Sequence, residues 1–182
     1  MKILAHAHPL RARWLKVPLA SGAYRRWLID RGSLTRQLQR RCADFKVQPV
    51  RLCNARLRTE EAGLLDISTR SRVLLREVRL HCGGEAAVFA RSLLPYRSLR
   101  GRWQGLGALG NRPLGGELFA DPSMVRTPIA YRKLAWHHEL YRRAVDQLEA
   151  PPPALWARRS VFRLRGAAIL ITEVFLPQVL AL

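Results

Sequence analysis

The segment RVLLREVRLHCGGEAAVFARSLLP, Arg72–Pro95, determines how the centre of the chain folds. Both of its halves are rich in aliphatic residues with polar residues between them, as in strands. Gly83-Gly84 between the halves is typical of the two-residue turn that joins antiparallel strands. We therefore predict a β-hairpin in which Cys82 pairs with Glu85, and in which the turn sets the register of every later pair.

Two arginines of this hairpin lie on the side that should face the core. Successive side chains of a strand point to opposite faces, and counting back from the turn places Arg76 directly opposite Arg91. Like charges at opposite positions destabilise a sheet, and an unpaired buried charge is strongly unfavourable. An anion is therefore expected between the two guanidinium groups.

This anion has two possible sources. One is Glu173, which interrupts the apolar, strand-like segment ILITEVFLP, Ile169–Pro177, near the end of the chain. The other is a bound ligand with carboxylates, which the planar guanidinium group can bind through two parallel hydrogen bonds. An internal Arg–Glu network, a solvated second face of the sheet, a pocket for a small organic anion and a nucleic-acid surface all remain open interpretations.

The remaining periodicity predicts an α+β fold built on a six-stranded antiparallel sheet with helices packed on it. Pro49 in the first expected strand favours an edge position or a bulge there. Gly166 marks a second hairpin near the C-terminus. The expected strands are 45–57, 72–82, 85–95, 124–136, 160–166 and 167–177.

Helices are expected before the first strand and in the connections. Residues Ala20–Cys42 have apolar side chains at helical spacing, with a break at Gly32 and an N-cap at Ser33 for a second helix. A further helix is expected within 137–150, and short helical turns are expected within the glycine-rich segment 100–119. A mobile glycine-rich segment beside an enclosed pocket would suit a lid.

The composition indicates a single domain, 1–182, with an unusual excess of positive charge. The chain is 48% hydrophobic and has a formal net charge of +19. Such a charge is either the footprint of an acidic partner or a general preference for arginine at surface positions. The arginines are spread along the chain, which favours the second interpretation. No RNA-binding or helix-turn-helix signature is present, so no nucleic-acid partner is expected.

Other features exclude several classes of protein. Cys42, Cys53 and Cys82 lack the spacing of a zinc site or of a disulfide framework, so we predict neither feature. Free cysteines are typical of a reducing compartment, which we therefore expect. His6 and Arg11 interrupt the apolar residues at the start, which argues against a signal peptide. The apolar C-terminal segment is too short to span a membrane. We therefore expect a cytoplasmic protein without a transmembrane segment.

Several short motifs in combination resemble the chorismate lyase family, over about Trp27–Pro177. Their order and spacing carry the similarity, and they are GSLT at 32–35, LLREV at 74–78, ARSLLP at 90–95, RPLGGELF at 112–119 and ILITEVFLP at 169–177. Members of that family convert chorismate to 4-hydroxybenzoate and pyruvate at the head of bacterial ubiquinone biosynthesis. The resemblance therefore implies a carbon–oxygen lyase.

The resemblance also implies a ligand pocket enclosed under flap-like segments, and it assigns roles to five residues. Arg76 would bind a carboxylate of the ligand, and Arg91 would reinforce the positive charge of the pocket. The backbone near Leu34 and Leu114 would contact the ligand under the flaps, and Glu173 would hydrogen-bond the ring hydroxyl. Arg76 and Glu173 are the candidate catalytic residues, with Glu173 either orienting the ring or removing the hydrogen from C4.

The implied reaction needs no metal or cofactor, because loss of pyruvate makes the ring aromatic. The expected partners are therefore chorismate and 4-hydroxybenzoate alone, bound by a monomer. Two features depart from the family pattern: Leu34 stands where the family usually has Met, and 137–155 looks like an inserted surface segment.

Two alternative functions remain open. The chain could be a non-catalytic effector-binding domain of the same fold for an aromatic acid, or a basic protein that binds nucleic acid or a membrane surface.

Overall fold

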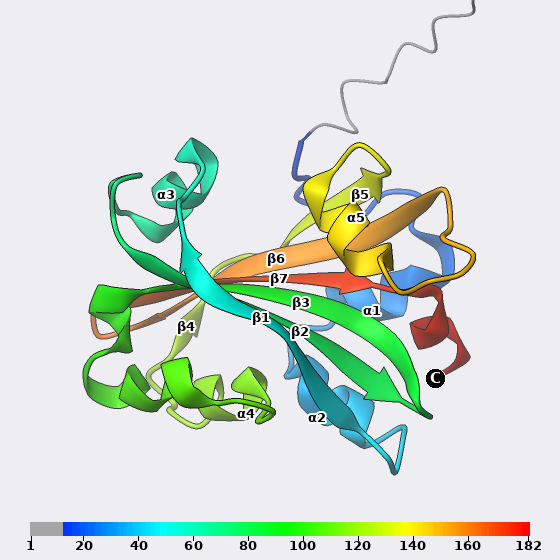
Figure 1. Ribbon diagram of the computed structural model, residues 1–182, viewed down its shortest axis with the longest axis horizontal. Coiled ribbons are helices and arrows are strands. Elements are labelled where there is room, and N and C mark those ends of the chain that lie inside the picture. The colour runs from blue at the N-terminus through cyan, green and yellow to red at the C-terminus, as the bar shows by residue number, and fades with distance from the viewer. Residues whose placement is uncertain (1–12) are drawn as a thin grey trace, which may run out of the picture.

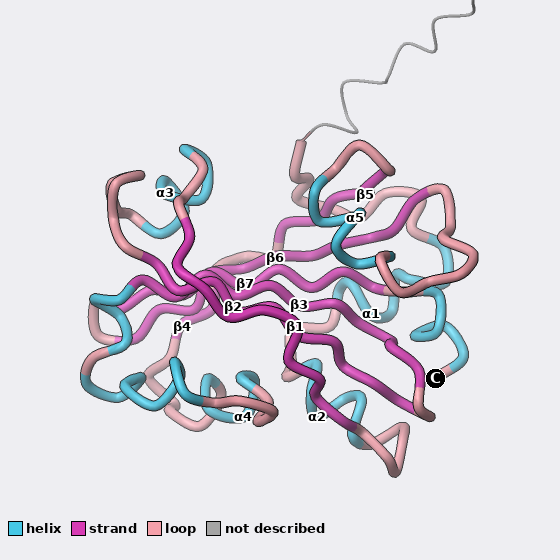
Figure 2. Tube along the Cα trace, viewed as in Figure 1, coloured by secondary structure: helices cyan, strands magenta, loops and turns pink. Residues whose placement is uncertain are grey.

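The computed structural model of the chain describes residues 13–182. These residues form an antiparallel sheet of seven strands in the order β1-β2-β3-β7-β6-β4, with β5 also paired to β6 (Figure 2). The strands are β1 (Lys46–Ala55), β2 (Val73–Cys82), β3 (Glu85–Pro95), β4 (Val125–Arg126), β5 (Ala130–Ala135), β6 (Ala154–Leu164) and β7 (Ala167–Phe175). The predicted α+β class with an antiparallel sheet is confirmed.

Helices cover both faces of the sheet (Figure 1). We call the two sides the α2/α4 face, which also carries α1, and the α3/α5 face. The α-helices are α1 (Arg25–Ile29), α2 (Leu34–Gln39), α3 (Thr59–Leu65), α4 (Leu114–Leu118) and α5 (Glu139–Val145). Short 3-10 helices are η2 (Gly22–Tyr24), η3 (Tyr96–Leu99), η4 (Gly101–Ala108) and η5 (Pro177–Ala181).

Each face has its own apolar core. On the α2/α4 face, Trp27 and Leu28 of α1 pack with Val78 and Phe175 of the sheet. On the α3/α5 face, apolar residues of α3 and α5 pack in two clusters that include Leu65, Leu140, Leu93 and Val174. The alternation of apolar side chains along each central strand therefore supplies both cores, as expected for a sheet buried on two sides.

The predicted hairpin is confirmed at its turn and wrong in its register. Cys82 pairs with Glu85, but the register shifts between Leu80 and His81, because Ala87 is an extra residue on β3. A bulge of one residue exchanges the two faces for every position beyond it. The main-chain carbonyl of Ala87 accepts a hydrogen bond from Leu176, so the bulge is tied to the end of β7.

The expected count of six strands was one too low, because the predicted strand 124–136 is two strands. Pro128 between β4 and β5 has no N–H to donate to β6. Thr127, just before this break, keeps the chain bonded to β6. Its N–H donates to the Val161 carbonyl, and its hydroxyl accepts a hydrogen bond from the Val161 N–H. The other expected break, at Pro49, is also present, and β1 is an edge strand with a register shift at Pro49/Arg51.

The early helices follow the prediction closely. Two short helices, α1 and α2, are separated near Gly32, and the Ser33 hydroxyl accepts a hydrogen bond from the backbone N–H of Arg36 as the N-cap of α2. Short helical turns occupy the glycine-rich segment as expected. The sequence interpretation missed α3, at whose start the Glu61 side chain accepts a hydrogen bond from the backbone N–H of Arg58 at 2.9 Å.

The prediction that no disulfide forms was wrong. Cys42, just after α2, and Cys82, the last residue of β2, are joined by a disulfide with their Cα atoms 5.7 Å apart. Forty positions separate the two residues in sequence, so only the packing of α2 against β2 brings them together. Cys53 on β1 is a free thiol.

Within 13–182, no helix is long and apolar enough to cross a membrane. The first residues, 1–12, which include His6 and Arg11 of the expected non-signal N-terminus, lie outside the described part of the chain.

Thiol titration tests the disulfide directly. In unfolded, unreduced protein we expect one reactive thiol, that of Cys53, and three after reduction. Replacing Cys42 and Cys82 by serine should lower the free energy of unfolding by about 4 kcal/mol, because the unfolded chain regains the entropy of a long open loop. Cys53→Ser is the matched control and should cost well under that. Three reactive thiols before reduction would contradict the structure.

Candidate functional site

A pocket lies between the sheet and helices α2 and α4, on the α2/α4 face. Its floor is largely apolar and includes Val78 of β2, Ala90 of β3 and Ile171 of β7. Three charged side chains also line it, and these are Arg76, Arg126 and Glu173. An apolar pocket with a few converging charged groups suits a small anionic organic ligand.

Arg76 of β2 is buried without a carboxylate partner among the described residues. Its side chain is only 5% exposed, and its Nη2 atom donates to the carbonyl oxygens of Gly110 at 3.0 Å and Arg112 at 2.9 Å. Burial lowers the pKa of the Arg76 guanidinium. A buried cation held by neutral carbonyls has a strong tendency to bind an anion.

The glycine-rich segment is folded so that it can make these two contacts. Gly110 has a positive φ of 51°, a conformation that is unfavourable for residues with a side chain. Next to it, the N–H of Arg112 donates to the carbonyl of Leu109 and closes a turn. The turn directs two carbonyl oxygens at the Arg76 guanidinium group.

Glu173 of β7 lies on the same face of the sheet and is fixed by a buried arginine. The Nε atom of Arg158 donates to its Oε2 atom at 2.5 Å. Arg158 is itself fully buried, and its Nη1 atom donates to the carbonyls of Trp27 at 2.7 Å and Asp30 at 2.6 Å. Since backbone carbonyls of α1 and of Asp30 just after it hold Arg158, and Arg158 holds Glu173, the carboxylate has a defined position at the edge of the pocket.

Arg126 is a pocket residue that the sequence interpretation missed. It lies on the short strand β4, paired with Phe162 of β6, and its guanidinium carbon is 5.0 Å from the centre of the Phe162 ring. Burial lowers the pKa of Arg126, and the charge of Glu173 partly offsets this effect. A two-residue strand inside a longer expected strand gives no signal from which the direction of this side chain could be predicted.

Leu34 and Leu114, the two residues expected to contact a ligand through their backbones, both line the pocket. They are the first residues of α2 and α4, where backbone N–H groups have no acceptor within the helix. The two helices touch at Gly115, where a Cβ atom would lie 3.0 Å from the Thr35 hydroxyl and 3.2 Å from the Ser33 hydroxyl. Glycine at 115 therefore allows the two helix starts to converge over the pocket.

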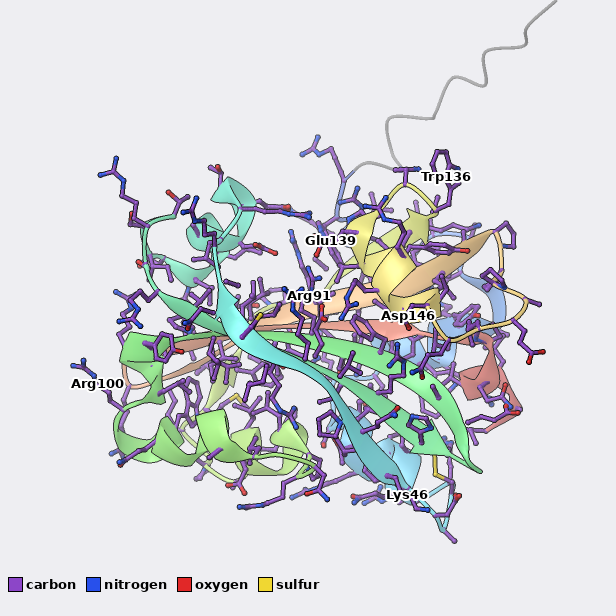
Figure 3. All side chains as sticks on the ribbon, in the orientation of Figure 1. Lys46, Arg91, Arg100, Trp136, Glu139 and Asp146 are labelled. Carbon is purple, nitrogen blue, oxygen red and sulfur yellow. A yellow bond between two sulfur atoms is a disulfide. The ribbon has the colours of Figure 1, made fainter. Side chains whose placement is uncertain are left out.

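The expected place of Arg91 in this pocket is corrected by the structure. Because of the bulge at Ala87, Arg91 pairs with Glu77 and not with Arg76, and its side chain lies on the α3/α5 face. Its Nε atom donates to Glu77 at 2.9 Å, and its Nη2 atom donates to Glu139 of α5 at 2.5 Å (Figure 3). Burial lowers the pKa of Arg91, but Glu139 and Glu77 outweigh burial and raise it overall.

The segment 137–155, expected to be surface decoration, takes part in this internal network. Arg143 of α5 donates two hydrogen bonds to Oε2 of the fully buried Glu77, at 3.1 and 2.6 Å. Asp146, just after α5, forms an ion pair with the buried Arg79 of β2. The internal Arg–Glu network that the sequence left open is therefore present, on the face opposite the pocket.

The structure thus brings together four of the five candidate residues, which are Arg76, Glu173, Leu34 and Leu114, and it adds Arg126. The pocket can bind a carboxylate at Arg76 and a hydrogen-bond donor at Glu173. Within residues 13–182, no group of three metal-binding side chains is placed to hold a metal ion.

The sequence as a whole matches known proteins closely. Residues 8–181 match the family described as chorismate lyase. A protein of Methylobacillus flagellatus called probable chorismate pyruvate-lyase is 50% identical over 95% of this chain and 97% of its own. A protein of Nitrosomonas europaea with the same description is 46% identical over 84% of this chain and 86% of its own.

Solved structures that resemble the chain are more distant in sequence. PhnF from Mycobacterium smegmatis superimposes with a TM-score of 0.61 and 17% identity, over 82% of this chain and 66% of that chain. The effector domain of the same protein gives a TM-score of 0.58 and 16% identity, over 81% of this chain and 90% of that chain. At this identity the likeness concerns the fold alone.

The contact at Gly115 predicts that alanine substitutions at two neighbouring glycines change the free energy of unfolding in opposite directions. Gly115→Ala should force α4 away from Ser33 and Thr35 and lower the free energy of unfolding by about 1 kcal/mol or more. Gly116→Ala is the matched control, because its Cβ would meet nothing within 4 Å and alanine favours the helix by up to about 1 kcal/mol. Urea unfolding of both variants checks this, and equal shifts would refute the close contact.

The position of Arg91 predicts a role in stability. Arg91→Met should lower the free energy of unfolding by about 3 kcal/mol, because the fully buried Glu77 loses one of its two cations. Arg58→Met removes the exposed partner of Glu139 and should cost less than about 1 kcal/mol. Urea unfolding separates the two, and a similar small loss for both variants would count against the buried network.

Proposed function

The chain belongs to the chorismate lyase family, and we propose that the pocket beneath α2 and α4 is where it splits chorismate into 4-hydroxybenzoate and pyruvate. The enzyme is a lyase that acts on chorismate, as its relatives over most of the chain are described. One observation carries the assignment of the pocket. Arg76 is buried, has no carboxylate partner among residues 13–182, and lines the same pocket as Glu173.

Chorismate fits the charges of this pocket. Its ring has a carboxylate at C1, an enolpyruvyl ether at C3 and a hydroxyl at C4. We assign the C1 carboxylate to Arg76 and the C4 hydroxyl to Glu173, which stand at different sides of the apolar floor formed by Val78, Ala90 and Ile171. Oε2 of Glu173 already accepts a hydrogen bond from Arg158, so Oε1 is the atom available to the hydroxyl.

Catalysis in this proposal is mainly a matter of position and charge. The C3–O bond breaks, its electron pair leaves with the pyruvate fragment, the hydrogen at C4 departs, and the ring becomes aromatic. Pyruvate forms when the fragment takes up a proton in place of the one lost. Holding the ether across the plane of the ring, with water excluded by α2 and α4, lowers the barrier without covalent chemistry by the protein.

The flaps expected from the resemblance correspond best to the segments that begin α2 and α4. Gly115 permits their contact, and the backbone N–H groups at Leu34 and Leu114 are placed at the rim of the pocket. Because α2 and α4 both lie over the pocket, we propose that these segments move apart for entry and release. The product keeps the carboxylate and hydroxyl that the pocket binds, so retention of product follows.

The wider context of the reaction is part of the same proposal. 4-Hydroxybenzoate is the ring precursor of ubiquinone in the family that the chain belongs to, and we propose that role here. We also propose that the enzyme is a single-domain monomer that works in the cytoplasm, without a metal or cofactor and without a nucleic-acid partner.

A second candidate is suggested by the fold. The effector domain of PhnF shares it, so a pocket of this type could bind an aromatic acid without turnover. That function predicts thermal stabilisation by 4-hydroxybenzoate and no pyruvate from chorismate.

A third candidate, a basic protein that binds nucleic acid or a membrane surface, is less well supported. Five of the 28 arginines are buried inside the protein, so the charge of +19 is only in part a property of its surface. The buried arginines are Arg76, Arg79, Arg91, Arg158 and Arg159. This function predicts binding that falls steeply with salt concentration.

The direct test is incubation of purified protein with chorismate, with pyruvate and 4-hydroxybenzoate measured together. The proposal predicts equal amounts of both, far above the spontaneous rate. Folded protein that forms neither product would overturn it.

Arg76→Ala should separate activity from stability. Turnover of chorismate should fall by roughly 100- to 1000-fold, because the buried carboxylate contact is lost. The free energy of unfolding should stay the same or rise, because an uncompensated buried charge is removed. Arg51→Ala, at an exposed position of β1, is the control and should retain activity. Near-normal turnover by Arg76→Ala would contradict the assignment.

A further inference from the structure

The Arg126 side chain is hydrogen-bonded to the protein through two of its nitrogen atoms and also lines the pocket. Its Nε atom donates to the Ser160 hydroxyl at 2.8 Å, and its Nη1 atom donates to the Arg31 carbonyl at 3.0 Å. Its Nη2 atom lies 4.0 Å from Oε2 of Glu173, which is an ion-pair distance but not a hydrogen bond.

We propose that Arg126 binds the second carboxylate of the substrate, that of the enolpyruvyl side chain, and so makes the pocket selective for a dianion. This inference rests on the proposed function, because it assumes that chorismate occupies the pocket with its C4 hydroxyl at Glu173.

The chemistry of chorismate places its second carboxylate beside Arg126. The enolpyruvyl ether is on C3, next to the C4 hydroxyl, and it is farther from C1. With C4 held at Glu173 and C1 held at Arg76, the side chain on C3 lies on the Glu173 side of the ring. Arg126 is the cation that lines the pocket beside Glu173, so its Nη2 atom is the donor within reach of the carboxylate.

Burial makes this contact effective. The Arg126 side chain is 12% exposed, it lies against the Phe162 ring, and burial lowers its pKa. The neighbouring Arg158 is already bonded to Glu173 and to backbone carbonyls. Glu173 therefore has a closer cation than Arg126, and Arg126 is left with unsatisfied positive charge that an incoming carboxylate can neutralise.

Two separate arginines also distinguish substrate from product. Chorismate has two carboxylates, whereas 4-hydroxybenzoate has one, at the position assigned to Arg76. When the C3–O bond breaks, the pyruvate fragment leaves with the carboxylate bound to Arg126. Arg126 thus holds the leaving group in place during bond cleavage, while Arg76 and Glu173 hold the ring.

A purely structural role for Arg126 makes different predictions. Its bonds to Ser160 and Arg31 join β4, β6 and the connection between α1 and α2. If that were its whole function, its replacement would disturb the pocket for every ligand to a similar degree. Selective loss of affinity for dianions is therefore the property that identifies carboxylate binding.

The test compares two stable ligands by calorimetry. One is 4-hydroxybenzoate, and the other is 3-(carboxymethoxy)-4-hydroxybenzoate, which adds an ether and a second carboxylate at the ring position that corresponds to C3. Arg126→Gln should weaken binding of the second ligand by about 10- to 100-fold and change binding of 4-hydroxybenzoate by less than about threefold. Arg126→Lys, which keeps the charge, should recover part of the lost affinity.

Two control variants complete the experiment. Ser160→Ala removes the partner of Nε but keeps the charge, and it should affect both ligands alike and only slightly. Arg163 of β6 pairs with Val125, the residue before Arg126 on β4. Arg163→Gln therefore removes a nearby cation that does not line the pocket, and it should leave both affinities unchanged. Equal weakening of both ligands by Arg126→Gln, or no change in either, would overturn the inference.

The outcome separates this inference from the proposed function. If the wild-type protein releases pyruvate from chorismate but Arg126→Gln shows no selectivity between the ligands, the function stands and the role of Arg126 is wrong. If the wild-type protein releases no pyruvate, the proposed function fails. Binding of the two ligands then shows whether Arg126 still recognises a second carboxylate.

Discussion

The buried charge of Arg76 is the constraint around which the pocket is built. Carbonyl oxygens of Gly110 and Arg112 hold its guanidinium group in place but leave its charge uncompensated. The glycine-rich segment folds back over the sheet to make these contacts, and α4, which lies within it, meets the start of α2 at Gly115. In the proposed complex, a ligand carboxylate supplies the negative charge that the protein leaves out.

The two faces of the sheet differ in how fully their buried arginines are paired. On the α3/α5 face, Arg91 has both Glu77 and Glu139 as partners. On the α2/α4 face, Arg158 is paired with Glu173, whereas Arg76 has carbonyls alone and Arg126 is only loosely paired with Glu173. Buried arginines thus stabilise the fold through ion pairs and, in the proposed function, also bind the ligand on the α2/α4 face.

The sequence predicted what depends on local pattern and failed where one residue changes the outcome. The hairpin turn, the edge position of Pro49 and the cap at Ser33 each follow from residues close together in the chain. The bulge at Ala87 inserts one ordinary residue into a regular strand, and nothing local marks it, so Arg91 was assigned to the wrong face. Contacts between distant segments were missed for the same reason, among them the disulfide and the inward direction of Arg126.

The most direct test of the account is a crystal structure of the protein with 4-hydroxybenzoate bound. The account predicts the ligand beneath α2 and α4, with its carboxylate within hydrogen-bond distance of the Arg76 guanidinium and its hydroxyl at Glu173. A ligand bound in that pocket in the reverse orientation, or bound on the α3/α5 face beside Arg91, would contradict it.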